Sequence, residues 1–108
     1  FGNYPVVYEI SYKKNELNED ALKPGIVDGV IQWFNYINKK TNLQFDYIVL
    51  NNQYGEGTIK IRDGWNLYID IAGRFDEQTD ELNLLLKEKI NGNINYVDLR
   101  YPGRVYWK

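Results

Sequence analysis

Residues 96–108, which read YVDLRYPGRVYWK, constrain the fold more than any other part of the chain. Polar and apolar side chains alternate over 96–101, and a period of two is typical of a β-strand. The run 104–107 is β-branched and aromatic, so it also favours an extended strand. Between them, Pro102-Gly103 is a strong turn signal. We therefore predict that the chain ends in a hairpin.

A second hairpin is predicted from residues 58–62 and 65–72. The Asp63-Gly64 pair between these runs is typical of a type I′ turn, which needs positive φ at both central residues. The second strand would place one set of apolar side chains inward, with polar residues and Tyr68 on the other face. That inward set is Trp65, Leu67, Ile69 and Ile71.

Two further strands are predicted at 4–12 and 43–51, where apolar and polar residues again alternate. Pro5, near the start of the first, is compatible with a strand at the edge of the sheet. In the second, one side is predicted to carry Leu43, Phe45, Tyr47 and Val49. The polar segments 13–20 and 51–57 are interpreted as loops.

A helix is predicted from Ile26 to Lys40, because apolar residues recur there at a helical spacing. The stripe consists of Val27, Val30, Ile31, Phe34 and Ile37, and we expect Trp33 and Tyr36 to widen it within the core. Lys39 and Lys40 suit the negative end of the helix dipole, and Asn42 could adopt the left-handed cap.

A second helix is predicted after Gly73, with Asp76 or Thr79 as its N-cap. Acidic residues in its first turn are favourable at the positive end of the dipole. Gly92 is expected to end the helix. Its apolar stripe consists of Leu82, Leu85, Leu86 and Ile90.

The predicted element order is β-α-β-β-β-α-β-β within one domain, residues 1–108. Hairpin connections and two amphipathic helices favour an α+β fold: a single, mainly antiparallel sheet with both helices packed on one face. A chain of 108 residues, 44% of them hydrophobic, can bury one modest core.

Composition argues against several classes of function. The net charge is -2 and neither half is basic, so we expect no nucleic-acid partner. The sequence has no His and no Cys, which are the usual metal ligands, general base and nucleophile. An enzyme would therefore have to be built from carboxylates, Lys, Ser, Thr and Tyr, which is weak ground for catalysis, and we expect no metal, no cofactor and no small-molecule substrate.

Carboxylates leave one catalytic alternative open. Asp70 and Asp98 could form the acid pair of a glycan hydrolase, although salt bridges and turns account for them more simply. Similarly, the acidic residues at the start of the second helix lack the spacing of a calcium loop, and the helix dipole explains them. These residues are Asp76, Glu77, Asp80 and Glu81. Asp98 and Arg100 lie two apart on one strand face and can pair with each other.

The unusual feature that remains is aromatic content, with ten Tyr, three Trp and four Phe. Tyr and Trp are favoured at protein interfaces. Tyr101, Tyr106 and Trp107 lie in the terminal hairpin, whose last strand could leave an open sheet edge. Such an edge can accept a strand from a partner.

The terminal segment also resembles a known family. YVDLRY, followed by a turn and a last aromatic strand, is similar to the C-terminal end of the FtsQ/DivIB family of bacterial cell-division proteins. A glycine-containing hairpin (Asp63-Gly64-Trp65) and a Leu-rich helix (82–90) precede it in the family's order. Pro5-Val6-Val7 looks like the end of the family's preceding POTRA segment.

The resemblance implies a non-enzymatic scaffold of the divisome, which acts at the septum. It implies a POTRA domain and one transmembrane helix upstream of residues 1–108, so that the full protein is a single-pass protein of the cell membrane with this domain extracytoplasmic. The implied partners are FtsB/DivIC-like and FtsL-like division proteins, which add a strand to the last strand of the domain.

Carried over by position, the resemblance assigns partner binding to Tyr101, Gly103, Arg104, Val105, Tyr106 and Trp107. Asp98, Leu99 and Arg100 become the structural motif of the strand before them. The compact Pro102-Gly103 turn and the end at Lys108 depart from the family pattern. Two alternatives stay open: another envelope-assembly module, such as a secretion or pilus platform domain, and a small cell-wall glycan hydrolase.

Overall fold

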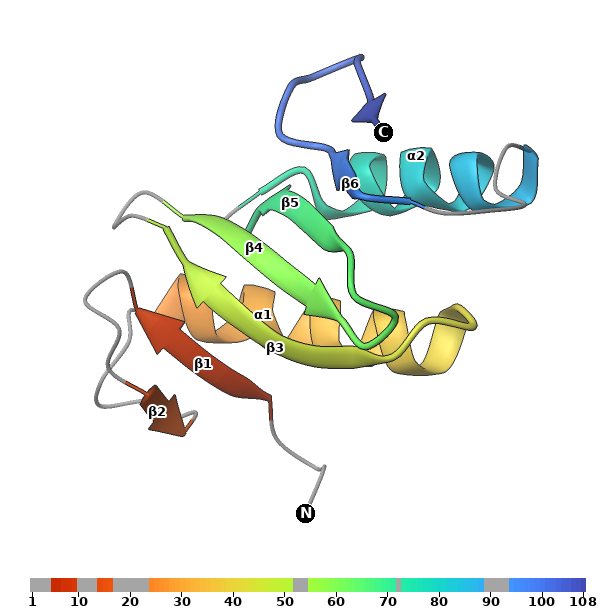
Figure 1. Ribbon diagram of the computed structural model, residues 1–108. Coiled ribbons are helices and arrows are strands. Elements are labelled where there is room, and N and C mark those ends of the chain that lie inside the picture. The colour runs from red at the N-terminus through yellow and green to blue at the C-terminus, as the bar shows by residue number, and fades with distance from the viewer. Residues whose placement is uncertain (1–4, 10–13, 17–23, 52–54, 72, 89–93) are drawn as a thin grey trace.

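The structure is a computed structural model that describes residues 5–9, 14–16, 24–51, 55–71, 73–88 and 94–108. Within these residues, two helices and seven strands follow one another (Figure 1). In chain order they are β1 (Val6–Glu9), β2 (Lys14–Glu16), α1 (Pro24–Lys40), β3 (Phe45–Leu50), β4 (Glu56–Ile61), β5 (Asn66–Asp70), α2 (Phe75–Glu88), β6 (Tyr96–Asp98) and β7 (Tyr106–Trp107).

The strands form one sheet in the order β2-β1-β3-β4-β5-β6-β7. Four neighbouring pairs are antiparallel, whereas β1 with β3 and β5 with β6 are parallel. The predicted α+β class is confirmed, with a mixed sheet. Parallel pairs arise because α1 precedes β3 and α2 precedes β6, and a helical crossover returns the chain in the same direction.

Both helices pack on one face of the sheet and share a single core with it. α1 contributes Val30 and the fully buried Trp33, and α2 contributes Leu82. The helices also meet each other, since the Tyr36 hydroxyl donates to the Thr79 carbonyl at 3.2 Å. Figure 1 shows α1 crossing behind β3 and α2 beside β6. The other face of the sheet carries no helix among the described residues.

Gly29 explains how closely α1 approaches the sheet. A Cβ atom at this position would overlap the backbone carbonyl of Ile71, which follows β5. The helix therefore uses a residue with no side chain at its contact with the sheet. Ile31, predicted in the apolar stripe, is instead 38% exposed, because the buried side of the helix is centred on Val30 and Trp33.

The N-terminal strands differ from the prediction in two ways. β1 lies between β2 and β3, so its predicted edge position is wrong. The edge on that side is β2, within a segment predicted to be a loop: Lys14, Asn15 and Glu16 pair with Tyr8, Val7 and Val6. A charged tripeptide has no strand periodicity of its own, and only pairing with β1 makes it extended.

A β-bulge changes the facing of β3. The register shifts between Phe45 and Tyr47, so Ile48 and Leu50 follow Phe45 into the core. Tyr47 and Val49, which were predicted to share the side of Phe45, lie on the open face instead. A bulge inserts one residue into the strand and so reverses the alternation beyond it.

The central hairpin is confirmed, and its turn differs from the predicted one. Trp65, Leu67, Ile69 and Ile71 are buried as predicted. Gly64 has a φ of 106°, whereas Asp63 is not in the positive region. The Gly64 N–H donates to the Ile61 carbonyl and the Ile61 N–H to the Trp65 carbonyl, at 2.9 and 3.0 Å. This is a three-residue loop with Gly64 as the bulge residue, in place of a type I′ turn.

Both predicted helix caps are wrong. Thr41 ends α1 instead of Asn42: its hydroxyl donates to the Ile37 carbonyl at 2.6 Å and accepts from the Leu43 N–H at 3.0 Å. At the start of α2, Asp76 and Thr79 are already helical. The residue before the helix is Arg74, whose φ of 55° is the one positive value among described non-glycine residues.

Strand β4 begins earlier than predicted. Glu56 and Gly57, predicted as loop, belong to β4, where they pair with Asp70 and Ile69. Ile90, Gly92 and residues 10–12 and 17–20 lie outside the described residues, as does 52–54.

Candidate functional site

The terminal hairpin forms one edge of the sheet. β7 pairs with β6 alone, with Val97 opposite Trp107 and Asp98 opposite Tyr106. Lys108 and Tyr96 exchange backbone hydrogen bonds at 3.1 and 3.2 Å. Backbone groups alternate in direction along an antiparallel strand. The N–H and C=O of Trp107, and those of Val105, therefore point away from β6, where no described strand lies.

Exposed aromatic side chains surround this edge. Tyr101, Tyr106 and Trp107 are 49%, 44% and 45% exposed, which are high values for residues of this size. The rings of Tyr101 and Tyr106 meet edge to face at 5.7 Å. The register places Tyr106 on the open face with Asp98, and Trp107 on the core-facing side with Val97. A strand added here would meet an aromatic side chain on each face of the sheet.

The turn fixes the distance between Tyr101 and β7. The Arg104 N–H donates to the Tyr101 carbonyl at 3.1 Å, and Gly103 has a φ of 71°. A residue with a side chain would be strained at that φ, so the glycine is needed for the turn. We call Tyr101 together with residues 103–107 the C-terminal edge surface. It holds all six residues that the sequence assigned to partner binding, and Val105 packs partly against the core.

The strand before the turn is held by a charged pair. Asp98, buried in the sheet, accepts from the Arg100 guanidinium at 3.0 and 2.8 Å and from the Arg100 N–H at 3.1 Å. These hydrogen bonds raise the pKa of Arg100, and its partial burial acts in the opposite direction. The guanidinium also lies over the rings of Tyr68 and Tyr101, at 5.2 and 5.5 Å. Leu99 is completely buried.

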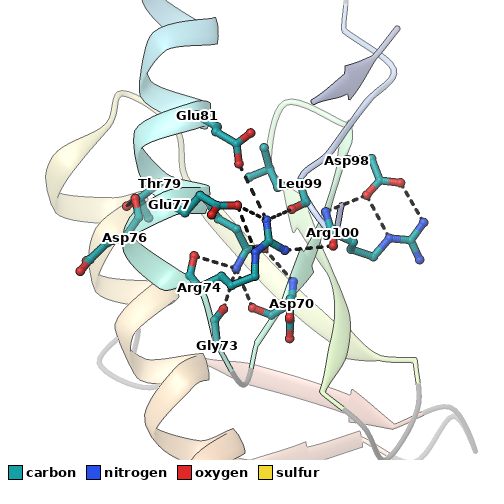
Figure 2. A network of polar contacts seen from close by, with 11 residues as sticks. Asp70, Gly73, Arg74, Asp76, Glu77, Thr79, Glu81, Asp98, Leu99 and Arg100 are labelled. Atoms are coloured by element: carbon teal, nitrogen blue, oxygen red, sulfur yellow. Dashed lines mark hydrogen bonds and ion pairs between the residues drawn. The ribbon is translucent and has the colours of Figure 1, made fainter. Parts of the chain in front are cut away.

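A polar network connects this strand to the start of α2 (Figure 2). The Arg74 guanidinium donates to the backbone carbonyls of Arg100 and Leu99, at 3.0 and 3.4 Å. It also binds the Glu77 carboxylate at 2.5 Å. The hydrogen bond from Arg74 lowers the pKa of Glu77, and a backbone bond from Gly103 lowers it further. Arg74, the residue before α2, therefore ties the start of this helix to the end of the β6 segment.

Glu81 lies at the margin of this network. Its Oε1 is 3.9 Å from the Arg74 guanidinium, and that buried oxygen accepts no hydrogen bond from a described residue. Burial raises the pKa of Glu81, the negative charge of Glu77 raises it further, and Arg74 opposes both effects. Within the described ranges, no group of acidic residues has the arrangement of a metal site, including the acidic start of α2.

Gln78 was not predicted as a site residue, and it is completely buried. Its amide oxygen accepts from the Asp70 N–H at 2.8 Å, and its amide nitrogen donates to the Asp70 and Gly73 carbonyls, both at 2.9 Å. The last residue pair between β5 and β6 is Tyr68 with Asp98. Beyond it, the Gln78 side chain takes the place of a strand and binds the backbone of β5 at Asp70. Gln78 lies four residues before Leu82 and seven before Leu85, so the helical stripe, extended by one turn, would have identified it.

The two carboxylates of the hydrolase alternative have different surroundings. Both oxygens of Asp98 are bonded by Arg100. The Asp70 side chain lies partly exposed on β5, opposite Glu56. The structure therefore places these two acids in the same sheet and gives one of them a permanent cationic partner.

In the described part of the chain, neither helix has the length and apolar character needed to cross a membrane. No protein-family model and no curated protein matches this sequence.

Proposed function

We propose that this chain is a non-enzymatic interaction domain that binds an extended segment of a partner protein by strand addition at β7. The observation that carries the proposal is the C-terminal edge surface, where the outward N–H and C=O of Trp107 meet no described strand. Main-chain hydrogen bonds to such an edge supply affinity, and the neighbouring side chains supply specificity.

The side chains at this edge suit a protein partner. Tyr101, Tyr106 and Trp107 expose large apolar surfaces, and Tyr and Trp are enriched among the residues that dominate binding energy. The edge is also well supported, because Arg74 binds the Arg100 carbonyl just before the turn and the Arg100 guanidinium lies over the Tyr101 ring. A preorganised surface loses less conformational freedom on binding.

We further propose that the domain is of the FtsQ/DivIB type. The support is the YVDLRY motif together with the position of Tyr101 and Trp107 beside an open edge. On this proposal the full protein is a septal scaffold in the cell membrane, anchored by one helix and carrying a POTRA domain, with residues 1–108 outside the cytoplasm. Its partners are FtsB/DivIC-like and FtsL-like division proteins.

A pull-down with the FtsB/DivIC-like and FtsL-like proteins encoded in the same genome tests the proposal. Tyr101→Ala and Trp107→Ala should each weaken capture by about 2 kcal/mol, the magnitude of an interface hot spot. Leu84→Ala is a matched control, since Leu84 is an exposed apolar residue of α2. Circular dichroism should show that all three variants remain folded. Capture that is unchanged in both aromatic variants would overturn the proposal.

A further inference from the structure

The face of the sheet without helices contains a second candidate site, distant in sequence from the terminal hairpin. A hollow of about 530 Å³ extends over four neighbouring strands, β1, β3, β4 and β5. Ligand pockets in proteins commonly measure about 300–1,000 Å³. The hollow is therefore large enough for a small molecule.

Two tyrosines form its walls, and ring contacts fix both of them. The Tyr47 ring meets Tyr8 edge to face at 5.1 Å. The Tyr68 ring meets Tyr96 at 6.0 Å, and the Arg100 guanidinium covers it at 5.2 Å. Such contacts stabilise aromatic rings in one orientation. The tyrosine rings that line the hollow are thus held in place before a ligand arrives.

Lys60 lies between these walls. The register pairs it with Tyr47 of β3 on one side and with Asn66 of β5 on the other. Its ammonium donates to the Asn66 amide oxygen at 2.9 Å, and an ammonium has three N–H donors. Among the described residues that line the hollow, Lys60 alone is charged. This positive centre in the hollow favours an anionic ligand.

The other polar groups of the hollow are neutral. The Asn51 amide donates to the Thr58 hydroxyl at 3.0 Å, and Asn66 accepts from Lys60. Tyr8, Tyr47 and Tyr68 add three phenolic hydroxyls. A sugar has the matching chemistry, because its C–H face packs on an aromatic ring and its hydroxyl groups exchange hydrogen bonds with amides and hydroxyls. A nucleotide phosphate is less well matched, since one ammonium would face the whole phosphate charge.

We infer that this hollow binds an acidic sugar. The sugar carboxylate pairs with the Lys60 ammonium, and the ring lies against Tyr47 or Tyr68. Asn51 and Asn66 bind its hydroxyl groups. This is a binding site and involves no bond making or breaking. It is separate from the C-terminal edge surface, so the domain can hold a glycan and a protein partner at the same time.

Titration of the protein with digalacturonate, followed by amide NMR shifts, tests the inference. We expect saturable shifts at Tyr47, Lys60 and Tyr68. Lys60→Gln should weaken binding about tenfold or more, because it removes a charge-assisted hydrogen bond, whereas Lys60→Arg should retain most of the affinity. The neutral methyl ester of the same disaccharide should lose affinity by a similar factor.

Lys39→Gln provides a matched control, since Lys39 is an exposed lysine in the last turn of α1. It should bind digalacturonate like the unmodified protein, and so should Trp107→Ala. An absence of saturable shifts would overturn the inference. So would equal binding by Lys60→Gln, shifts centred on β7, or tighter binding of uridine monophosphate than of digalacturonate.

Discussion

The two edges of the sheet expose the same kind of backbone and carry opposite kinds of residue. β2 consists of Lys14, Asn15 and Glu16, and β7 consists of Tyr106 and Trp107. Charged residues on an edge strand discourage pairing with another chain, whereas exposed aromatic residues add affinity to it. An unpaired edge backbone is therefore not enough to make a binding surface. The neighbouring side chains make β7, and not β2, the edge suited to binding a partner.

The β7 edge also has a support of its own. Gln78 of α2 binds the backbone of Asp70 at the end of β5, and Arg74, just before α2, donates to the Arg100 carbonyl beyond β6. Figure 2 shows Arg74 between Glu77 and the backbone of Leu99 and Arg100. The described contacts of β2 are its backbone pairs with β1. Because of this difference, substitutions in and just before α2 should destabilise the β7 side of the sheet and leave the stability of β1 and β3 unchanged.

Gln78→Leu should have the largest effect, a loss of about 3 kcal/mol in the free energy of unfolding. The substitution leaves the Asp70 N–H and two or more carbonyls without their partner, and each buried polar group left unpaired costs about 1–3 kcal/mol. Urea denaturation measures the loss. Gln32→Leu, at an exposed site on α1, should change little. A loss below about 1 kcal/mol would show that Gln78 is not a structural link.

Substitutions at Arg74 separate the stabilising hydrogen bonds of its side chain from the destabilising positive φ of its backbone. Arg74→Ala removes the hydrogen bonds to the Leu99 and Arg100 carbonyls, so we expect the free energy of unfolding to fall by about 2 kcal/mol. The unfavourable φ of this position remains in the alanine variant. Arg74→Gly loses the same bonds but adopts a φ of 55° without strain. It should be more stable than the alanine variant by about 1 kcal/mol. A glycine variant no more stable than the alanine variant would contradict this interpretation of the turn.

Glu81 should give the smallest effect, seen as a change in pH dependence. Because burial raises its pKa in the folded state, folded protein binds this proton more tightly than unfolded protein. The contribution of protonated Glu81 to the free energy of unfolding is greatest below the ordinary glutamate pKa of about 4.5. It is lost as the pH rises through the raised pKa of Glu81 in the folded protein. Glu81→Gln should therefore gain stability relative to the original chain between acidic and neutral pH, as thermal unfolding would show.

Glu77→Gln is the matched control, since the pKa of Glu77 is lowered. Its contribution is present above the ordinary glutamate pKa and is lost as the pH falls, so this variant should lose stability at neutral pH. Parallel pH profiles for the two variants would contradict the assigned roles of Arg74 and burial.

Local sequence patterns predicted most of the elements, and contacts between distant segments account for what they missed. Alternation identified β5 with its buried face and also β6, and helical spacing identified both helices. No local signal indicates that β1 pairs in parallel with β3 or that residues 14–16 become a strand. The bulge after Phe45 reversed the facing of Tyr47 and Val49, and so concealed the tyrosine-lined hollow.

In the candidate site, too, local patterns predicted the residues of one element and missed the contacts that come from another. The positions of Tyr101, Tyr106 and Trp107 in a terminal hairpin were predictable from alternation and from the Pro102-Gly103 turn. The support of this hairpin was not, because Arg74 reaches the Leu99 and Arg100 carbonyls from the start of a different element. Arg74 has no sequence signature for a positive φ, which only the surrounding bonds stabilise.

Replacing Trp107 by alanine and by proline tests the central claim most directly. Proline removes the outward N–H in addition to the side chain, and edge strands tolerate proline because the inward bonds belong to neighbouring residues. Calorimetric titration of both variants with a partner identified by the proposed pull-down should show Trp107→Pro binding more weakly than Trp107→Ala by about 1 kcal/mol, one backbone hydrogen bond. Equal affinities of the two folded variants would contradict strand addition at β7.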